Sequence, residues 1–374
     1  MIISDDGKFM ATFDNRNCVC LFKYSNQYHK EDTSEEWWFV GKHRTHQRPI
    51  TSICFGQSYN DKDPPQLYYR LFSIGEDRLV FEYDTTWDPE SYSILKVIKT
   101  FPIELESIPT ACIWYPQLDL KEELLLTCNE DYKMKLWNPT TENSRRTCLG
   151  PTYGGAINKL KLLSWMGGEK YLLYATKKKV IGLIKLPLDG NPNKTMGLIA
   201  HPEDVTDIAC SPSGQFVFTC GGSDLSVNLW QVDVAPIEQK IAAGFGVQLG
   251  QSLADEHLIQ PFINLIEGGQ DGQTFQDMND FFYYSMIRSK KENTTKTRKL
   301  DGKVPVDEIN NLMKAMGYYP TKLEEKNMYD EVRNQCLASD GTPTTHIGLN
   351  EFIKLFVNHR PVYGIGQQNI EEAF

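Results

Sequence analysis

The sequence predicts an all-β propeller of about five blades, followed by an all-α domain. Two observations support this prediction. From about Gly244 onward, the spacing of apolar residues changes from period 2 to period 3.6, which is typical of helices. Before that point one pattern recurs: an apolar strand, a tight polar turn, and a second strand that closes on an aromatic. Its copies are FMATFDNRNCVCLF, LFSIGEDRLVFEY, LLLTCNEDYKMKLW and FVFTCGGSDLSVNLW.

The last copy shows what one blade contains. Residues 205–210 (VTDIAC) alternate as in a strand, and residues 211–214 form a turn of turn-forming residues. Two more strands are predicted at 216–219 and 227–230. The first copy follows the same plan, with only Ile2-Ile3 remaining of its first strand.

Three more blades are predicted between these copies, opening at ITSICFG, TACIWYP and INKLKLLSW. The last copy has no outer strand before Pro236. Because an unpaired sheet edge is a liability, we expect the chain to be the C-terminal part of a longer protein, or another chain to complete the ring. Closure by five blades alone is the alternative. Outer strands are predicted at residues 37–43, 93–101, 144–150 and 196–202.

Three acidic residues, Asp77, Asp131 and Asp224, lie in the turns between paired strands. Asp side chains cap turns by accepting hydrogen bonds from nearby backbone amides. We expect these residues to cap the turns and to bond a histidine or a backbone amide of the blade. Their predicted role is structural, not catalytic.

The blade pattern resembles the WD40 family over residues 1 to about 233. The resemblance depends on strands that end in Leu136-Trp137, Leu229-Trp230 and, more weakly, Glu82-Tyr83. The Asp that completes the WD pair is mostly absent, so these repeats are degenerate. A propeller of this kind implies a binding surface more than an active site.

Amphipathic helices are predicted in the second half of the chain. The strongly apolar stretch FFYYSMI belongs to one of them, and the basic segment Lys290–Lys299 is expected to be an exposed loop. Residues expected on apolar helix faces are Leu258, Phe262, Leu265, Ile266, Ile309, Leu312, Met313, Met316, Met328, Val332, Phe352, Ile353, Leu355 and Phe356.

Two segments of this half resemble EF-hand calcium loops. The first, TRKLDGKVPVDEI, offers Asp301, Gly302 and Glu308, but Thr297 and Lys299 stand at loop positions 1 and 3, where calcium loops usually have carboxylates. An ammonium group at that place repels the ion, so we expect this loop to be metal-free.

The second segment is DGTPTTHIGLNEF, in which Asp340 and Glu351 stand at the ends of the loop. Thr342 and Thr344 replace carboxylates, and Thr345 replaces the glycine of the sharp turn. We expect this loop to be metal-free too, although weak calcium binding through Asp340, Thr342, Thr344 and Glu351 stays open. Of the EF-hand architecture we expect two features to remain: a two-stranded bridge between Val304 and Ile347, and a groove for a partner helix.

These patterns divide the chain into blades at 1–235, a linker at 236–254, and an EF-hand-like helical domain with a C-terminal tail at 255–374. The net charge of −10 argues against a nucleic-acid partner. No apolar run spans a bilayer and no signal peptide is evident. The cysteines fit reduced, packed thiols, and the run Lys177-Lys178-Lys179 fits a solvated turn.

An enzyme is the first alternative class, and the sequence disfavours it. No GxSxG, HExxH or P-loop motif is present. The histidines are widely spread; His43 and His201 lie near strand ends, as blade histidines do, and His43 and His46 are the one close pair. We therefore predict no catalytic residue, cofactor or metal site.

Two aromatic pairs, Trp37-Trp38 and Tyr283-Tyr284, are candidate anchors for a partner protein. Core packing is the role that we expect for each of them.

Six segments point further: LGPTYGG, DGNPNKT, TCGGSD, DFFYYSMIRS, GYYP and FVNHRPVYG. Together with the blades they resemble the ciliary WD-repeat proteins of the calmodulin- and spoke-associated complex, in their C-terminal half. The resemblance spans nearly the whole chain. Members of this family have more blades upstream than the chain shows.

The resemblance implies a scaffold of the ciliary or flagellar axoneme at the base of radial spoke 3. Its implied partners are proteins of the radial spoke base and of the calmodulin- and spoke-associated complex, calmodulin, and the doublet microtubule. The implied role is support of dynein-driven motility. Two readings remain as alternatives: a calcium switch that acts through the second loop, and a general WD scaffold in trafficking or ubiquitin transfer.

Overall fold

In the computed structural model of the chain, the described residues are 1–25, 36–59, 66–86, 94–118, 122–165, 168, 170–244, 255–290, 301–334 and 343–362. The chain divides into two compact units. The first contains Met1–Glu130, Leu136–Glu142 and Ile157–Leu160, and the second contains Asp131–Lys135, Asn143–Ala156 and Lys161–Phe374. The boundary between the units runs through the third blade.

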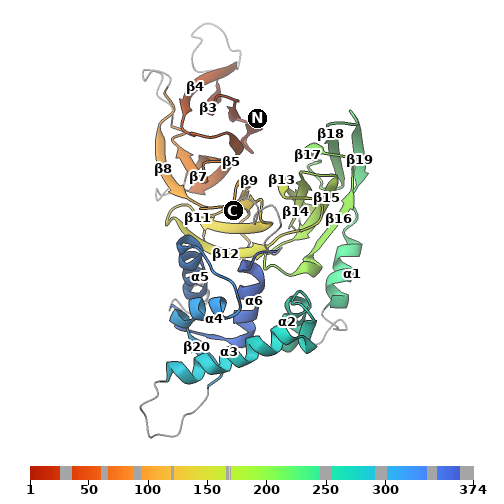
Figure 1. Ribbon diagram of the computed structural model, residues 1–374. Coiled ribbons are helices and arrows are strands. Elements are labelled where there is room, and N and C mark those ends of the chain that lie inside the picture. The colour runs from red at the N-terminus through yellow and green to blue at the C-terminus, as the bar shows by residue number, and fades with distance from the viewer. Residues whose placement is uncertain are drawn as a thin grey trace, which may run out of the picture. The chain divides into compact units, whose positions relative to one another are not determined.

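Five antiparallel blade sheets form in the described part of the chain, which confirms the predicted propeller fold (Figure 1). The first four have four strands each, and the last has three, β17-β18-β19. Each of the four predicted outer strands is present. The strands are β1 Ile2–Ile3, β2 Phe9–Phe13, β3 Cys18–Ser25, β4 Glu36–Arg44, β5 Ile50–Tyr59, β6 Leu67–Gly75, β7 Leu79–Tyr83, β8 Val97–Pro102, β9 Pro109–Tyr115, β10 Leu124–Asn129, β11 Lys133–Asn138, β12 Asn143–Leu149, β13 Ile157–Ser164, β14 Lys170–Thr176, β15 Val180–Lys185, β16 Thr195–Ile199, β17 Val205–Cys210, β18 Phe216–Gly221 and β19 Val227–Gln231.

The core of the first unit lies between neighbouring blade sheets. Alternation along β2 and β3 places Ala11, Val19 and Leu21 on one buried face, where they meet Leu71 of β6. A second cluster joins Phe72 of β6 to residues of the third blade. Close approach of the sheets explains Gly56, because a Cβ there would lie 2.6 Å from the Trp114 ring.

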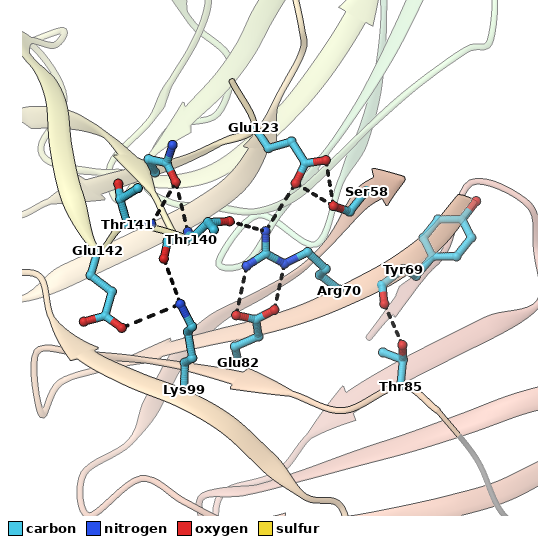
Figure 2. A network of polar contacts seen from close by, with 11 residues as sticks. Ser58, Tyr69, Arg70, Glu82, Thr85, Lys99, Glu123, Thr140, Thr141 and Glu142 are labelled. Atoms are coloured by element: carbon cyan, nitrogen blue, oxygen red, sulfur yellow. Dashed lines mark hydrogen bonds and ion pairs between the residues drawn. The ribbon is translucent and has the colours of Figure 1, made fainter. Parts of the chain in front are cut away.

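A buried ion-pair network crosses from the second blade to the third within the first unit (Figure 2). Arg70 of β6 forms two hydrogen bonds with Glu82 of β7, at 2.7 and 3.0 Å. Its Nη1 lies 3.3 Å from Glu123, which accepts a bond from Ser58 at 2.6 Å. Burial lowers the pKa of Arg70, but the hydrogen bond and charge of Glu82 reverse this, so that the pKa lies above its usual value.

The second unit combines two blades with the helical region. Leu163, Tyr171 and Val205 belong to a cluster between the fourth and fifth blades, and helix α1 (Ala235–Gly244) adds Ile237 to it. Glu238 of α1 bonds Tyr171 and Lys185 of the fourth blade at 2.7 and 2.5 Å. Residues 235–244, most of which were expected in the linker, are therefore helical, and residues 245–254 lie outside the described part.

The remaining helices enclose one apolar core. They are α2 Asp255–Ile263, α3 Gln273–Ser289, α4 Ile309–Ala315, α5 Lys322–Asn334 and α6 Leu349–His359. Of the residues expected on apolar faces, Phe262, Ile309 and Phe352 are among those in this core. Strands β20 (Lys303–Pro305) and β21 (His346–Gly348) pair with Val304 opposite Ile347, which confirms the predicted bridge.

Helices α5 and α6 pack against β12, the outer strand of the third blade (Figure 1). Strand β12 and both helices belong to the second unit. None of the helices in the described part has the length and apolar character needed to cross a bilayer.

Candidate functional site

A histidine network closes the second blade. His46 Nδ1 lies 2.9 Å from Asp77, and its Nε2 lies 2.7 Å from the Ser73 hydroxyl, which bonds Tyr83 at 2.8 Å. The Gln47 amide also donates to Asp77 at 3.1 Å. Burial raises the pKa of Asp77, but the His46 bond outweighs it and holds the pKa below its usual value. The structural role predicted for Asp77 is confirmed.

The residue types of this network, Asp, His and Ser, are those of a hydrolytic triad. A nucleophile must meet a substrate, however, and Ser73 is fully buried at 0% exposure. Its hydroxyl is also engaged by Tyr83. The arrangement therefore braces the blade and offers no nucleophile.

The last blade repeats the network with one change. His201 lies 2.8 Å from both Asp224 and Thr219, and the Trp230 indole donates to Thr219 at 2.9 Å. The His201 bond lowers the pKa of Asp224 to about 2. The structural role predicted for Asp224 is thereby confirmed, as is a blade position for His201.

Two predictions about the blades need correction. His46, not His43, is the blade histidine of the second blade; His43 lies in β4, and its buried Nδ1 has no partner in the described part. In the third blade Trp137 donates to Thr127 at 3.1 Å, as Trp230 does to Thr219 in the last blade, but residues 103–108, which lead from β8 into β9, contain no histidine. Asp131 therefore has no histidine to bond there.

A buried polar junction joins the helical region to β12 inside the second unit. One carboxylate oxygen of Glu331 on α5 accepts from the Thr147 amide at 3.0 Å and from His359 of α6 at 2.9 Å. Glu331 is 9% exposed and His359 is 6% exposed. Removing the carboxylate would leave a buried amide and a buried imidazole without their acceptor.

Asn358 of α6 extends this junction to the fourth blade. Its side-chain oxygen accepts from the Leu149 amide at 3.1 Å, and its amide group donates to the Asp189 carbonyl at 3.5 Å. Gly190 comes so close that a Cβ there would lie 2.0 Å from the Asn358 oxygen, and its φ is +82°. Glycine is therefore required at position 190 both for its conformation and for its size.

Lys133 of β11 holds the C-terminal end of α6. Its Nζ donates to the carbonyls of Asn358 and Arg360, each at 2.6 Å. A helix C-terminus has unpaired carbonyls and attracts positive charge. Burial lowers the pKa of Lys133 to about 7, and the positive charges of Lys135 and Arg360 add to this effect.

The carboxylates at the ends of the EF-hand-like loops already have protein partners. Glu308 bonds Arg288 and Asn311, and Glu351 accepts from the Gly348 amide at 2.9 Å, which caps α6. Asp301 is paired with Lys290 at 3.1 Å, and this bond lowers its pKa. These contacts compete with any cation.

Other loop residues contribute little to a metal site in the described part. Asp340, Thr342, Thr297 and Lys299 lie outside the described residues, while the Thr344 amide bonds the Arg333 carbonyl at 3.1 Å. No cluster of three or more metal-binding side chains occurs among the described residues.

A cavity of about 380 Å³ lies within the second unit. Three segments that set this chain apart from a generic WD protein contribute to its wall: LGPTYGG, DGNPNKT and FVNHRPVYG. Lys240 of α1 and Arg360 after α6 also line it. The sequence singles out these segments without showing that they meet.

Exposed aromatic and aliphatic side chains mark three further places on the surface. Tyr283 and Tyr284 on α3 are 50% and 59% exposed, so the expected core role is wrong for this pair. Trp37 is also exposed and forms a tilted ring contact with Tyr24, with 5.1 Å between ring centroids. The last blade exposes one apolar face, formed by Phe216, Phe218, Val227 and Leu229.

The comparisons with known proteins agree with this architecture. A model of the CFAP251 C-terminal domain matches residues 273–374, and one of the WD domain, G-beta repeat, matches residues 190–231. Cilia- and flagella-associated protein 251 of Tetrahymena thermophila is 47% identical over 392 residues, covering 100% of this chain and 38% of that protein. The Mus musculus protein of that name is 34% identical, covering 99% of this chain and 27% of that protein.

The likeness extends to a distant alga. Cilia- and flagella-associated protein 251 of Chlamydomonas reinhardtii is 21% identical over 377 residues, covering 100% of this chain and 32% of that protein. The chain thus spans about a third of the length of these relatives. Over its whole length it aligns with proteins that carry one name, cilia- and flagella-associated protein 251. The chain therefore belongs to the cilia- and flagella-associated protein 251 family of ciliary WD-repeat proteins.

Proposed function

We propose that this chain is a non-enzymatic scaffold of the axoneme, at the base of radial spoke 3 in the calmodulin- and spoke-associated complex. The observation that carries the proposal is the buried junction of Glu331, His359 and Thr147. It fixes the helical region to blade strand β12, so that this strand and the helices form one binding platform within the second unit. A scaffold needs such a platform because partners bind best to preorganised surfaces.

The partners in this proposal are proteins of the spoke base, calmodulin and the doublet microtubule. Exposed Tyr283 and Tyr284 provide aromatic anchors of the kind that dominate protein interfaces. The blade histidine networks support the non-enzymatic role, because Ser73 and Thr219 are fully buried and bonded within the blade.

The first test is recovery from cilia. The tagged chain is expressed in ciliated cells, and demembranated axonemes are isolated with calcium and with chelator. We expect the chain to co-purify with radial-spoke and calmodulin-complex proteins in both conditions. A variant with Tyr283→Ser and Tyr284→Ser should lose partners, while the exposed-residue control Tyr319→Ser should retain them. Absence of the chain from axonemes would overturn the proposal.

A calcium-responsive switch is the alternative function, through Asp340, Thr342, Thr344 and Glu351. Binding would have to displace the Glu351 cap on α6. Calorimetric titration of the full chain with calcium separates the two functions. The scaffold predicts no uptake at micromolar calcium. Uptake abolished by Glu351→Gln, but kept in Glu324→Gln, would establish the switch, since Glu324 caps α5 in the same manner.

A further inference from the structure

The cavity in the second unit has cationic groups without acidic partners. Lys240 Nζ donates to the carbonyls of Pro192 and Thr195, at 3.2 and 2.8 Å. Arg360 donates to the Leu265 carbonyl at 2.6 Å and lies over the Phe356 ring. Neither cation forms an ion pair with a carboxylate of the described part. Cations of this kind in a partly enclosed wall attract an anion.

The tyrosine of β14 adds an unused donor to this cavity. Tyr174 is 2% exposed, lines the cavity, and forms no hydrogen bond through its hydroxyl with the described residues. The fold makes room for the hydroxyl: Gly182 and Gly197 are paired across β15 and β16, and a Cβ on either would lie 2.6 Å from it. The hydroxyl is therefore free to donate to a group that enters the cavity.

The charged residues around the cavity indicate which anion it would bind. Burial lowers the pKa of Arg360, and the nearby charge of Glu267 opposes this effect. Lys194, close in sequence to the cavity wall, is neutralised by Asp189 at 2.6 Å. Lys240, Arg360 and the Tyr174 hydroxyl are three donors, and a carboxylate has two oxygens with enough lone pairs to accept from all of them.

The rest of the wall indicates what carries the carboxylate. Val180, Leu265 and Val357 supply apolar surface, and Tyr153 stands at the cavity with 68% of its surface exposed. A volume of about 380 Å³ lies in the range of binding pockets and exceeds the size of a single inorganic ion. An aliphatic stem with a terminal carboxylate, flanked by apolar residues, fills such a site.

We propose that this cavity binds a glutamate-containing, apolar peptide segment of a partner protein, with its carboxylate between Lys240, Arg360 and the Tyr174 hydroxyl. The inference rests on the proposed scaffold function only in naming a partner protein. The binding site itself is tested on the purified chain, so its failure would leave the axonemal test unaffected.

The probe is a fluorescent nine-residue peptide of alternating leucine and glutamate, and its control has glutamine for glutamate. Anisotropy with the full chain should show saturable binding of the acidic peptide only, weakening with salt. We expect Lys240→Gln and Arg360→Gln to weaken binding about tenfold, and Tyr174→Phe about threefold. Lys194→Gln, whose cation is already paired, should bind as the unsubstituted chain does.

Tyr174→Phe removes only the unpartnered hydroxyl, so its thermal unfolding should be unchanged or slightly raised, which separates binding from folding. Equal binding of the glutamine peptide, or unchanged binding by all three variants, would overturn the proposal. So would displacement of the peptide by inorganic phosphate at low concentration, which would identify a phosphate site. Binding only by a chain cut after Val362 would instead assign the cavity to residues 363–374, whose sequence contains Glu371 and Glu372.

Discussion

The last blade and the junction on β12 both bury a histidine against a carboxylate, but they use it differently. In the blade, His201 lies just before β17 and Asp224 lies in the turn between β18 and β19, so the two bond over only 23 residues of sequence. At the junction, Glu331 and His359 reach across to Thr147, 184 residues from Glu331 in the sequence. The blade network recurs in the second blade, whereas the junction occurs once in the described part of the chain. The blade network is thus a feature of the repeat, whereas the junction fixes the helices to β12.

This difference predicts unequal consequences of substitution. A blade network stabilises one sheet that is also held by its strand hydrogen bonds. The junction has few alternatives, because its buried donors have a single carboxylate between them. Changes at the junction should therefore detach the helical region while the blades keep their fold.

The largest effect is expected from Glu331→Ala. Losing a buried carboxylate that serves two donors should lower the free energy of unfolding of the second unit by about 3 kcal/mol. Urea unfolding and protease sensitivity of α5 and α6 measure the effect. The neighbouring Asp330→Asn is the control, because burial raises the pKa of Asp330 and its buried Oδ2 has no partner in the described part. Equal losses in both variants would contradict a special role for Glu331.

A glycine pair tests the close approach of the fourth blade to α6. Gly190→Ala should lower the free energy of unfolding by about 1–3 kcal/mol because of the positive φ at this position. The close contact with Asn358 should lower it further. Gly155→Ala has nearly the same φ, +84°, but the nearest atom would lie at an ordinary 3.8 Å. The difference in thermal stability between the two variants isolates the contact. Equal melting temperatures of the two variants would show that the close approach of Gly190 to Asn358 does not contribute to stability.

The repeats could be predicted from the sequence because their contacts are local. A strand, a turn and a strand within a few tens of residues leave a period-2 pattern, and the Val304–Ile347 bridge follows from the spacing of two similar loops. The junction could not be predicted, because Asn358 and Leu149 are 209 residues apart and no second copy reveals their pairing. The helix period also explains the error at Tyr283-Tyr284: Phe282 and Met286 take the buried face of α3, which turns the tyrosines outward.

The Lys133 amine offers a pH test of the junction. Its pKa is about 7 in the fold and ordinarily 10.5, so the unfolded chain binds more protons between these values. Stability of the second unit should therefore rise as pH increases from about 7 toward 10. Urea unfolding across this range measures the rise, and Lys133→Met should flatten it. A Lys133→Met variant that keeps the full slope would assign the effect to other groups.

The smallest effect is expected in the last blade, at Asp224. Its pKa of about 2 lies below the ordinary 3.8, so its contribution to stability is present above pH 4 and is lost as pH falls toward 2. The effect should be modest because solvent screens this partly exposed carboxylate. In acid titrations followed by tryptophan fluorescence, Asp224→Asn should reduce the loss between pH 4 and 2, and the helix-surface control Asp280→Asn should not. Because the bond to His201 stays within the blade, the contacts of Glu331 should be unaffected by Asp224→Asn; simultaneous detachment of α5 and α6 would show that the blade network and the junction act as one.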